Sequence, residues 1–180
     1  MNTIRRVAVL GAGTMGSRIA AHLANAGIPS LLLDVTLPDA PERSAASRRG
    51  LDAAAKGKPP AFFTGSGRKL VETGNFEDHL ARVESCDWII EAVTENLDIK
   101  RALWDRVAAA RSPGSILSTN TSGIPLRLIS EGWLEEMRRN FLGTHFFNPP
   151  RYLHLVEIIP GADTTPEVLG LVSDLCDRRL

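Results

Sequence analysis

The sequence predicts an α/β fold in which a mostly parallel sheet carries helices on both faces. Short apolar runs, such as residues 7–10 and 87–93, alternate with amphipathic helical stretches, which is the pattern of strands joined by right-handed crossover helices. A glycine-rich turn follows the first run. Near the C-terminal end, two β-rich runs are separated only by residues 148–151. That connection is too short for a crossover helix and predicts an antiparallel pair.

The turn after the first strand has the spacing G-x-G-x-x-G, and a helical pattern follows it. Gly11 permits a tight turn, Gly13 lets a ligand approach bare backbone, and Gly16 lets the helix pack closely on the sheet. The unpaired N–H groups at the start of the helix, around Thr14 and Met15, would then face the phosphates of a dinucleotide.

A second apolar strand, residues 31–33, ends on Asp34, 18 residues after Gly16. A carboxylate at this position accepts hydrogen bonds from both ribose hydroxyls of adenosine and repels a 2′-phosphate. Because no arginine follows Asp34 directly, NAD is favoured over NADP, and FAD remains the alternative dinucleotide. Together these features predict one Rossmann-type NAD-binding domain over residues 1–180.

The composition argues against several other classes of protein. The 180 residues include 21 basic and 21 acidic side chains, a balance that does not favour nucleic acid or a membrane surface as partner. No apolar run is long enough to span a bilayer, and the run after Arg5 and Arg6 is too short for a signal peptide. Cys86 and Cys176 lack metal-binding spacing, so we expect reduced thiols in a cytoplasmic protein and no metal site.

The middle of the chain begins with a predicted helix over residues 42–57 and a loop rich in proline and glycine over 56–67. Residues 42–69 hold seven basic residues against two acids. Such a cluster is either a solvated helix face or a landing site for a polyanionic group of a substrate.

The remaining predicted elements are a strand over 87–93, a helix over 96–111, a strand over 115–118, short helices over 126–137, strands over 140–147 and 153–159, and a helix over 165–179. Ligands of such sheets bind beyond the carboxyl ends of the parallel strands. We therefore expect the glycine turn, Asp34, residues 92–95 and residues 120–122 to share one cleft.

The two C-terminal strands contain the candidate chemistry. By the two-residue period of a strand, Glu157 shares one face with Leu153, Leu155 and Ile159. A carboxylate on an apolar strand face needs a partner. A hairpin centred on the intervening turn would place His145 directly opposite Glu157. An imidazole held by a carboxylate can remove the proton of an alcohol while hydride leaves the carbon, although such a pair can also be purely structural.

Several motifs together resemble the NAD-binding domain of the (S)-3-hydroxyacyl-CoA dehydrogenases, over nearly the whole chain. They are GAGTMGSRIA at 11–20 with Asp34, IIEAVTENLDIK at 89–100, STNTSGIP at 118–125, GTHFFNPP at 143–150 and HLVEIIPG at 154–161. The stretch GNFEDHL at 74–80 is most similar to the long members, which are fused to an enoyl-CoA hydratase module.

The resemblance implies roles for individual residues. His145 would be the catalytic base, Glu157 the acid that orients it, and Ser122 the group that hydrogen-bonds the substrate hydroxyl or the ketone product. The implied cofactor contacts beyond the glycine turn and Asp34 are Ala92, Val93, Glu95, Lys100, Asn120, Ser122 and Asn148, of which Asn148 also belongs to the catalytic set. His154 stands where the family often has lysine, and we expect it to be a surface residue.

The resemblance further implies that the substrate is a 3-hydroxyacyl-CoA, oxidised to the 3-oxoacyl-CoA in fatty-acid β-oxidation. Lys56, Lys58 and Lys69 are candidates for binding coenzyme A. The family continues into a helical domain that closes over the acyl chain and builds a homodimer. Residues 1–180 contain no counterpart of it, so we expect this chain to bind NAD but to turn substrate over poorly.

Two other functions remain open at this point. One is a dinucleotide-binding protein of the same fold without catalysis, and the other is a dehydrogenase of free hydroxy acids that uses a lysine base. Replacement of His145 tests the first, because catalysis should depend on it. A comparison of free 3-hydroxy acids with their CoA thioesters tests the second.

Overall fold

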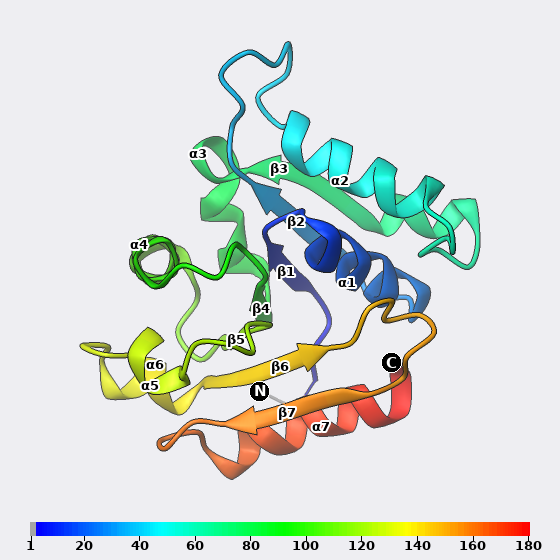
Figure 1. Ribbon diagram of the computed structural model, residues 1–180. Coiled ribbons are helices and arrows are strands. Elements are labelled where there is room, and N and C mark those ends of the chain that lie inside the picture. The colour runs from blue at the N-terminus through cyan, green and yellow to red at the C-terminus, as the bar shows by residue number, and fades with distance from the viewer. Residues whose placement is uncertain (1–2) are drawn as a thin grey trace.

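A seven-stranded sheet in the order β3-β2-β1-β4-β5-β6-β7 forms the centre of the protein (Figure 1). The structure is a computed structural model and describes residues 3–180. All neighbouring strands are parallel except β6 and β7, which are antiparallel. The predicted α/β fold with an antiparallel pair near the C-terminal end is therefore confirmed.

The elements follow one another in the expected alternation of strand and helix. The strands are β1 (Val7–Leu10), β2 (Ser30–Asp34), β3 (Val71–Asn75), β4 (Trp88–Glu91), β5 (Ile116–Thr119), β6 (Phe141–Phe146) and β7 (Val156–Pro160). The α-helices are α1 (Thr14–Asn25), α2 (Ala45–Lys56), α3 (Phe76–His79), α4 (Leu97–Ala110), α5 (Leu126–Ile129), α6 (Glu135–Arg139) and α7 (Pro166–Arg179). The 3-10 helices are η1 (Gly65–Leu70) and η2 (Leu80–Ser85).

Alternate side chains of the strands enter two separate cores, one on each face of the sheet. Val7 and Val9 of β1 belong to the core with α1, α2 and α7, whereas Ala8 and Leu10 belong to the core with α4. Figure 1 shows the same division, with α1 and α2 on one side of the strands and α4 to α6 on the other. All four β1 side chains are fully buried, which explains the continuous apolar run.

Strand β3 is an element that the sequence analysis does not predict. Its residues, VETGN, include one large apolar side chain and a glycine, a weak pattern for a strand. Gly74 fits there because a Cβ would lie 2.7 Å from Leu33 Cδ2 on the neighbouring strand. The strand is thus specified by its packing against β2, at the edge of the sheet, rather than by its own apolar pattern.

Several predicted boundaries differ from the structure by one to three residues, and the shift at the start of β7 affects the prediction for Glu157. Helix α2 begins at Ala45 rather than 42, strand β4 ends at Glu91 rather than 93, and strand β7 begins at 156 rather than 153. Leu155 and Ile159, expected to form a buried face with Glu157, are 58% and 42% exposed. The face of β7 that carries Glu157 is therefore open to solvent.

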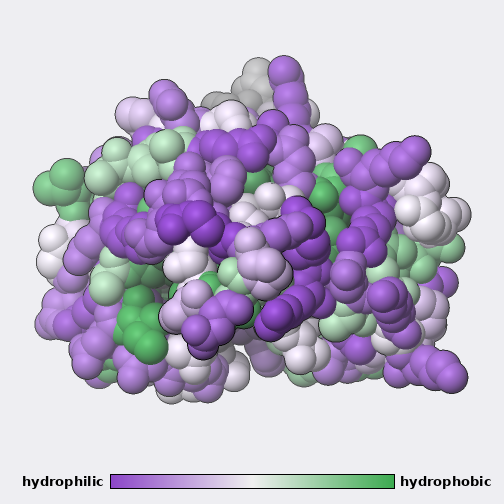
Figure 2. All heavy atoms as spheres, turned by 90° about the horizontal axis from the view of Figure 1, so that it is seen from above, coloured by the Kyte–Doolittle hydropathy of each residue, from purple (hydrophilic) through white to green (hydrophobic). Residues whose placement is uncertain are grey.

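The surface and the thiols agree with the composition. No helix within residues 3–180 is long and apolar enough to cross a membrane. The face shown in Figure 2 is mostly hydrophilic, with apolar side chains in separate patches. Cys86 is buried and Cys176 half-buried, both as free thiols, as expected. Burial raises the pKa of the Cys176 thiol to about 12, which keeps it protonated and unreactive.

Candidate functional site

The glycine turn between β1 and α1 leaves the start of the helix open. Gly11 has a φ of +99°, and a Cβ there would lie 2.7 Å from the carbonyl oxygen of Ala92, whereas a Cβ at Gly13 would have no neighbour within 4 Å. A Cβ at Gly16 would overlap the carbonyl oxygen of Gly11. No side chain among residues 3–180 caps the first turn of α1. The N–H groups at Thr14 and Met15 thus form a cradle that suits a pyrophosphate.

Asp34 lies at the end of β2 beside this turn. One carboxylate oxygen, Oδ2, accepts the backbone N–H of Ala12 at 2.6 Å, and Oδ1 accepts that of Val35 at 2.7 Å. Each oxygen keeps a further lone pair for a ligand hydroxyl. The carboxylate is therefore held in place, at the position where the sequence predicts ribose recognition.

A cavity of about 520 Å³ opens beside Asp34. Gly11, Gly13, Ala92 and Val93 line it together with Asp34, so three of the four segments expected in one cleft do converge. Residues 120–122 do not line this cavity. Thr94, within the expected segment 92–95, also lines it, and the lining residues that the sequence analysis missed are Val35, Phe76, Ile99, Ala102, Leu103 and Arg106.

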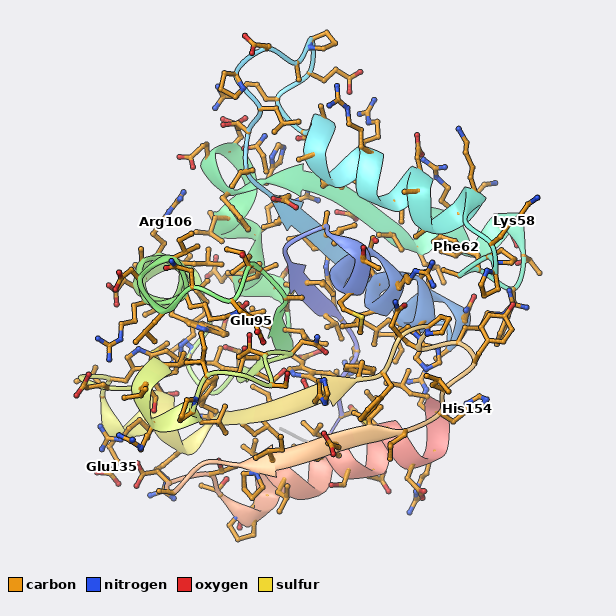
Figure 3. The ribbon with its side chains drawn as sticks, viewed as in Figure 1. Lys58, Phe62, Glu95, Arg106, Glu135 and His154 are labelled. Atoms are coloured by element: carbon orange, nitrogen blue, oxygen red, sulfur yellow. The ribbon has the colours of Figure 1, made fainter. Side chains whose placement is uncertain are left out.

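The missed residues give the cavity a mainly apolar wall, which suits a flat ring such as adenine. Most of the missed residues come from α4, and one of them, Ile99, is 49% exposed. The sequence pattern alone does not show that a large apolar residue is exposed in this way. Arg106 lies at the rim and donates to the carbonyl oxygen of Phe76 at 2.8 Å and to Glu77 Oε1 at 3.1 Å. Figure 3 shows it projecting from α4 toward α3.

His145 and Glu157 form the pair that the hairpin argument predicts. They are register partners on β6 and β7, and His145 Nδ1 lies 2.8 Å from Glu157 Oε2. Because an ionised carboxylate can only accept a hydrogen bond, Nδ1 carries the proton and Nε2 is left as an acceptor. The His145 side chain is 24% exposed and that of Glu157 is 51% exposed, so the imidazole can reach a ligand.

Neighbouring groups fix the end of β6 that carries this pair. The backbone N–H of Phe146 donates to Asn120 Oδ1 at 3.0 Å, which joins the loop after β5 to the strand of His145. The Phe147 ring lies 4.7 Å from the His145 ring, centroid to centroid. Asn148 follows directly and is exposed. Asn120, His145 and Asn148 therefore belong to one region at the carboxyl edge of the sheet.

Glu95 connects the turn after β4 with the loop that carries Ser122. Its Oε1 accepts the backbone N–H groups of Ser122 and Gly123, both at 3.2 Å. Figure 3 shows Glu95 near the centre of the carboxyl edge. The Ser122 side chain is exposed, so its hydroxyl is accessible while its backbone is held.

Lys100, an implied cofactor contact, does not line the cavity beside Asp34. Its side chain is 0% exposed, and Nζ donates to Glu91 Oε1 at 2.6 Å and to the Val93 carbonyl oxygen at 3.3 Å. This burial depends on how α4 is turned against the sheet, which the sequence pattern alone does not define.

The basic cluster over residues 42–69 separates into two groups. Three of its arginines pair with acids, as Arg43 with Asp78, Arg48 with Glu42, and Arg68 with Asp52. No acid within residues 3–180 forms an ion pair with Arg49, Lys56, Lys58 or Lys69, and all four are exposed.

The loop after α2 also contacts the loop between β6 and β7, a contact that the sequence analysis does not predict. Arg151 donates to the carbonyl oxygens of Pro60 and Phe62 at 2.9 and 2.7 Å, and its guanidinium lies 4.7 Å from the Phe63 ring centroid. In Figure 3, Lys58, Phe62 and His154 lie on this side of the molecule. His154 is exposed, as predicted.

The family model for the 3-hydroxyacyl-CoA dehydrogenase NAD-binding domain matches residues 6–179. A probable 3-hydroxyacyl-CoA dehydrogenase from Deinococcus radiodurans is 48% identical over 177 residues, which cover 98% of this chain and 51% of that protein. A putative fatty acid oxidation complex trifunctional enzyme from Rickettsia felis is 34% identical over 179 residues, or 99% of this chain and 25% of that protein. The chain spans about half of the first relative and a quarter of the second.

Solved structures whose titles name different reactions share this fold. 3-hydroxybutyryl-CoA dehydrogenase from Escherichia coli K12 superposes with a TM-score of 0.79 at 30% identity, over 97% of this chain and 36% of that one. An NAD+-dependent dismutase, 5-formyl-3-hydroxy-2-methylpyridine 4-carboxylic acid 5-dehydrogenase, has a TM-score of 0.75 at 29% identity, over 97% of this chain and 55% of that one.

Proposed function

The chain belongs to the 3-hydroxyacyl-CoA dehydrogenase NAD-binding domain family, and on that premise we propose that it carries the base and the NAD site for oxidising (S)-3-hydroxyacyl-CoA to 3-oxoacyl-CoA. The observation that carries this proposal is the His145–Glu157 pair at the carboxyl edge that also holds the glycine turn and Asp34. The trifunctional fatty acid oxidation relatives support a place in β-oxidation.

In the proposed reaction, the imidazole of His145 accepts the proton of the substrate hydroxyl at Nε2. Bound NAD supplies the hydride acceptor. Glu157 keeps the proton on Nδ1 and stabilises the imidazolium that forms, although its 51% exposure screens that attraction. General-base assistance of this kind is typically worth roughly 10²–10⁴-fold in rate.

The loops around this pair would orient the substrate. We assign to Ser122 a hydrogen bond to the substrate oxygen, since its hydroxyl is exposed and its backbone is held by Glu95. Asn120 and Asn148 would lie at the nicotinamide end of the cofactor, next to His145. Exposed cations that pair with no acid of residues 3–180, namely Lys56, Lys58 and Lys69, would attract the phosphates of coenzyme A.

The solvent-exposed face of β7 beside Glu157 should lower the rate of catalysis by residues 1–180 alone. Leu155 and Ile159 leave this face exposed, so water has access to the proposed base. Exclusion of water strengthens the electrostatic interactions of an active site. We therefore expect residues 1–180 alone to bind NAD and to oxidise substrate slowly, and to need further structure over this face, with the homodimer as its proposed assembly.

A substrate panel tests the proposed reaction against the alternative that the chain oxidises free hydroxy acids. NADH formation would be followed by absorbance with (S)- and (R)-3-hydroxybutyryl-CoA and with free 3-hydroxybutyrate. The proposal requires NADH from the (S)-thioester and little from the other two. Equal rates with the free acid would rule out the CoA thioester as the specific substrate, and no NADH from any hydroxy compound would favour a non-catalytic dinucleotide-binding role.

A further inference from the structure

Arg151, in the connection between β6 and β7, contacts a segment that lies far from it in the sequence. Its Nη1 donates hydrogen bonds to the carbonyl oxygens of Pro60 and Phe62 at 2.9 and 2.7 Å. The guanidinium also lies over the rings of Phe63 and Tyr152, 4.7 and 5.1 Å from their centroids. A planar group that donates along its edge and stacks through its face fixes both the distance and the orientation between the two loops.

The opposite side of this segment, residues 57–64, is held by Asn25, the last residue of α1. Asn25 Nδ2 donates to the carbonyl oxygen of Ala61 at 2.8 Å, and its Oδ1 accepts the backbone N–H of Phe63 at 2.8 Å. Between these two bonds, the Phe62 side chain is buried in the core that contains α1 and α2. The segment is therefore fixed from two sides, by α1 and by the loop before β7.

Both loops carry residues that have a part in the proposed function. Lys58, an exposed cation, lies two residues before the first of the carbonyl oxygens that Arg151 binds. In the other loop, Asn148 lies three residues before Arg151 and three residues after His145. Figure 3 shows Lys58 and His154, one from each loop, on the same side of the molecule. Arg151 thus connects the proposed site for the phosphates of coenzyme A with the strand of the proposed base.

The main consequence of these contacts is geometric. Hydrogen bonds between groups that water can reach contribute little net free energy, and ordering a loop costs conformational entropy. A fixed loop matters, however, to a thioester of coenzyme A, because its phosphates lie at one end and its reacting carbon at the other. The binding energy of a remote group assists a reaction only when its site is held in place relative to the reacting groups.

We propose that Arg151 is a positioning residue for the coenzyme A end of the substrate. It keeps residues 57–64 and their exposed cation at a fixed place relative to His145, so that binding of the nucleotide brings the thioester to the base. Asn25 shares this role from the side of α1. Arg151 acts through the backbone of the segment and does not touch the reacting atoms. This inference rests on the proposed function.

Single-turnover oxidation of two thioesters tests the inference. NADH formation from (S)-3-hydroxybutyryl-CoA and from (S)-3-hydroxybutyryl-pantetheine, which lacks the nucleotide, is followed with saturating NAD and an excess of the chain of residues 1–180. The chain concentration that gives half of the limiting rate is measured for the wild type, Arg151→Gln and Asn25→Ala, each checked for folding by thermal unfolding. Arg5→Gln is the matched control, because it removes an exposed positive charge just before β1, at the amino edge of the sheet.

We expect the half-saturating concentration for the CoA thioester to rise about fivefold to tenfold in Arg151→Gln and in Asn25→Ala. The limiting rate, and both values for the pantetheine thioester, should stay within twofold of the wild type. Arg5→Gln should change none of these quantities. Because only one of the two test variants alters the charge, agreement between them assigns the effect to the position of the loop.

The outcomes separate this inference from the proposed function. The inference is wrong if both folded variants saturate like the wild type, if both thioesters weaken equally, or if only Arg151→Gln has an effect, because loss of charge then explains it. A wild type that saturates equally with the two thioesters has no nucleotide site on residues 57–64, which overturns the inference and leaves the base unaffected. A wild type that oxidises neither thioester contradicts the proposed function itself. Should a test variant not fold, Arg151→Met or Asn25→Ser takes its place under the same criteria.

Discussion

Replacing Asp34 by asparagine should remove the preference for NADH over NADPH while preserving the shape of the side chain. The Asp34 carboxylate is fixed by the N–H groups of Ala12 and Val35, so it cannot turn away from a 2′-phosphate. Two like charges about 4 Å apart repel by about 1 kcal/mol in water and about 4 kcal/mol near a protein surface. For a partly exposed carboxylate facing a phosphate of charge near −2, we expect about 2–4 kcal/mol of discrimination, or roughly 30- to 800-fold.

Fluorescence titrations with NADH and NADPH measure this discrimination directly. In Asp34→Asn the ratio of the two Kd values should fall to within about fivefold, while the NADH Kd rises about tenfold because the amide is a weaker acceptor. Asp39→Asn is the control, since it removes the same charge from an exposed residue of the following loop and should leave both Kd values unchanged. The reasoning fails if Asp34→Asn still discriminates as the wild type does, or if the wild type binds NADPH as tightly as NADH.

Three further predictions test the glycine turn, the His145–Glu157 pair and the buried His22. Gly11→Ala adds a Cβ at a residue with a φ of +99°, against the Ala92 carbonyl oxygen. The free energy of unfolding should therefore fall by about 1–3 kcal/mol, and NADH binding should weaken. Unchanged thermal unfolding would contradict this prediction. Glu157→Gln should lower kcat by about 10²-fold or more without changing the NADH Kd, and an unchanged kcat would show that the pair is structural. Burial lowers the pKa of His22, so the unfolded state binds the proton first and stability should fall as pH drops below about 6.5. Urea unfolding at about pH 7 and pH 5 measures this fall, which should be smaller in His22→Gln.

The parts of the fold that follow from local pattern could be predicted from the sequence. The strands β1 and β4 are mainly apolar because both of their faces are buried, whereas β5 combines Ile116 and Leu117 with the equally buried Ser118 and Thr119. A hairpin turn centred on residue 151 predicts the register of β6 and β7, and therefore the pairing of His145 with Glu157. Strand β3 could not be predicted, because its position depends on packing against β2 and its own side chains carry little signal.

The candidate site, like the fold, could be predicted where it depends on local sequence pattern and not where it depends on packing. The glycine turn and Asp34 have a fixed local geometry, and the cavity forms next to them as expected. The apolar wall from α4 and the burial of Lys100 depend on how that helix rotates against the sheet, which spacing alone does not define. The exposure of Leu155 and Ile159 is likewise a property of what packs over β7, and an alternating strand pattern gives no information about that.

The role of His145 as the base is the central claim, and a single-turnover measurement tests it most directly. With the chain in excess over NAD and (S)-3-hydroxybutyryl-CoA, the rate of NADH formation reports hydride transfer even if catalysis is slow. We predict that His145→Gln lowers this rate at least about 100-fold, with the NADH Kd within twofold of the wild type. A rate within a few-fold of the wild type in the folded variant would contradict the assignment of His145 as the base.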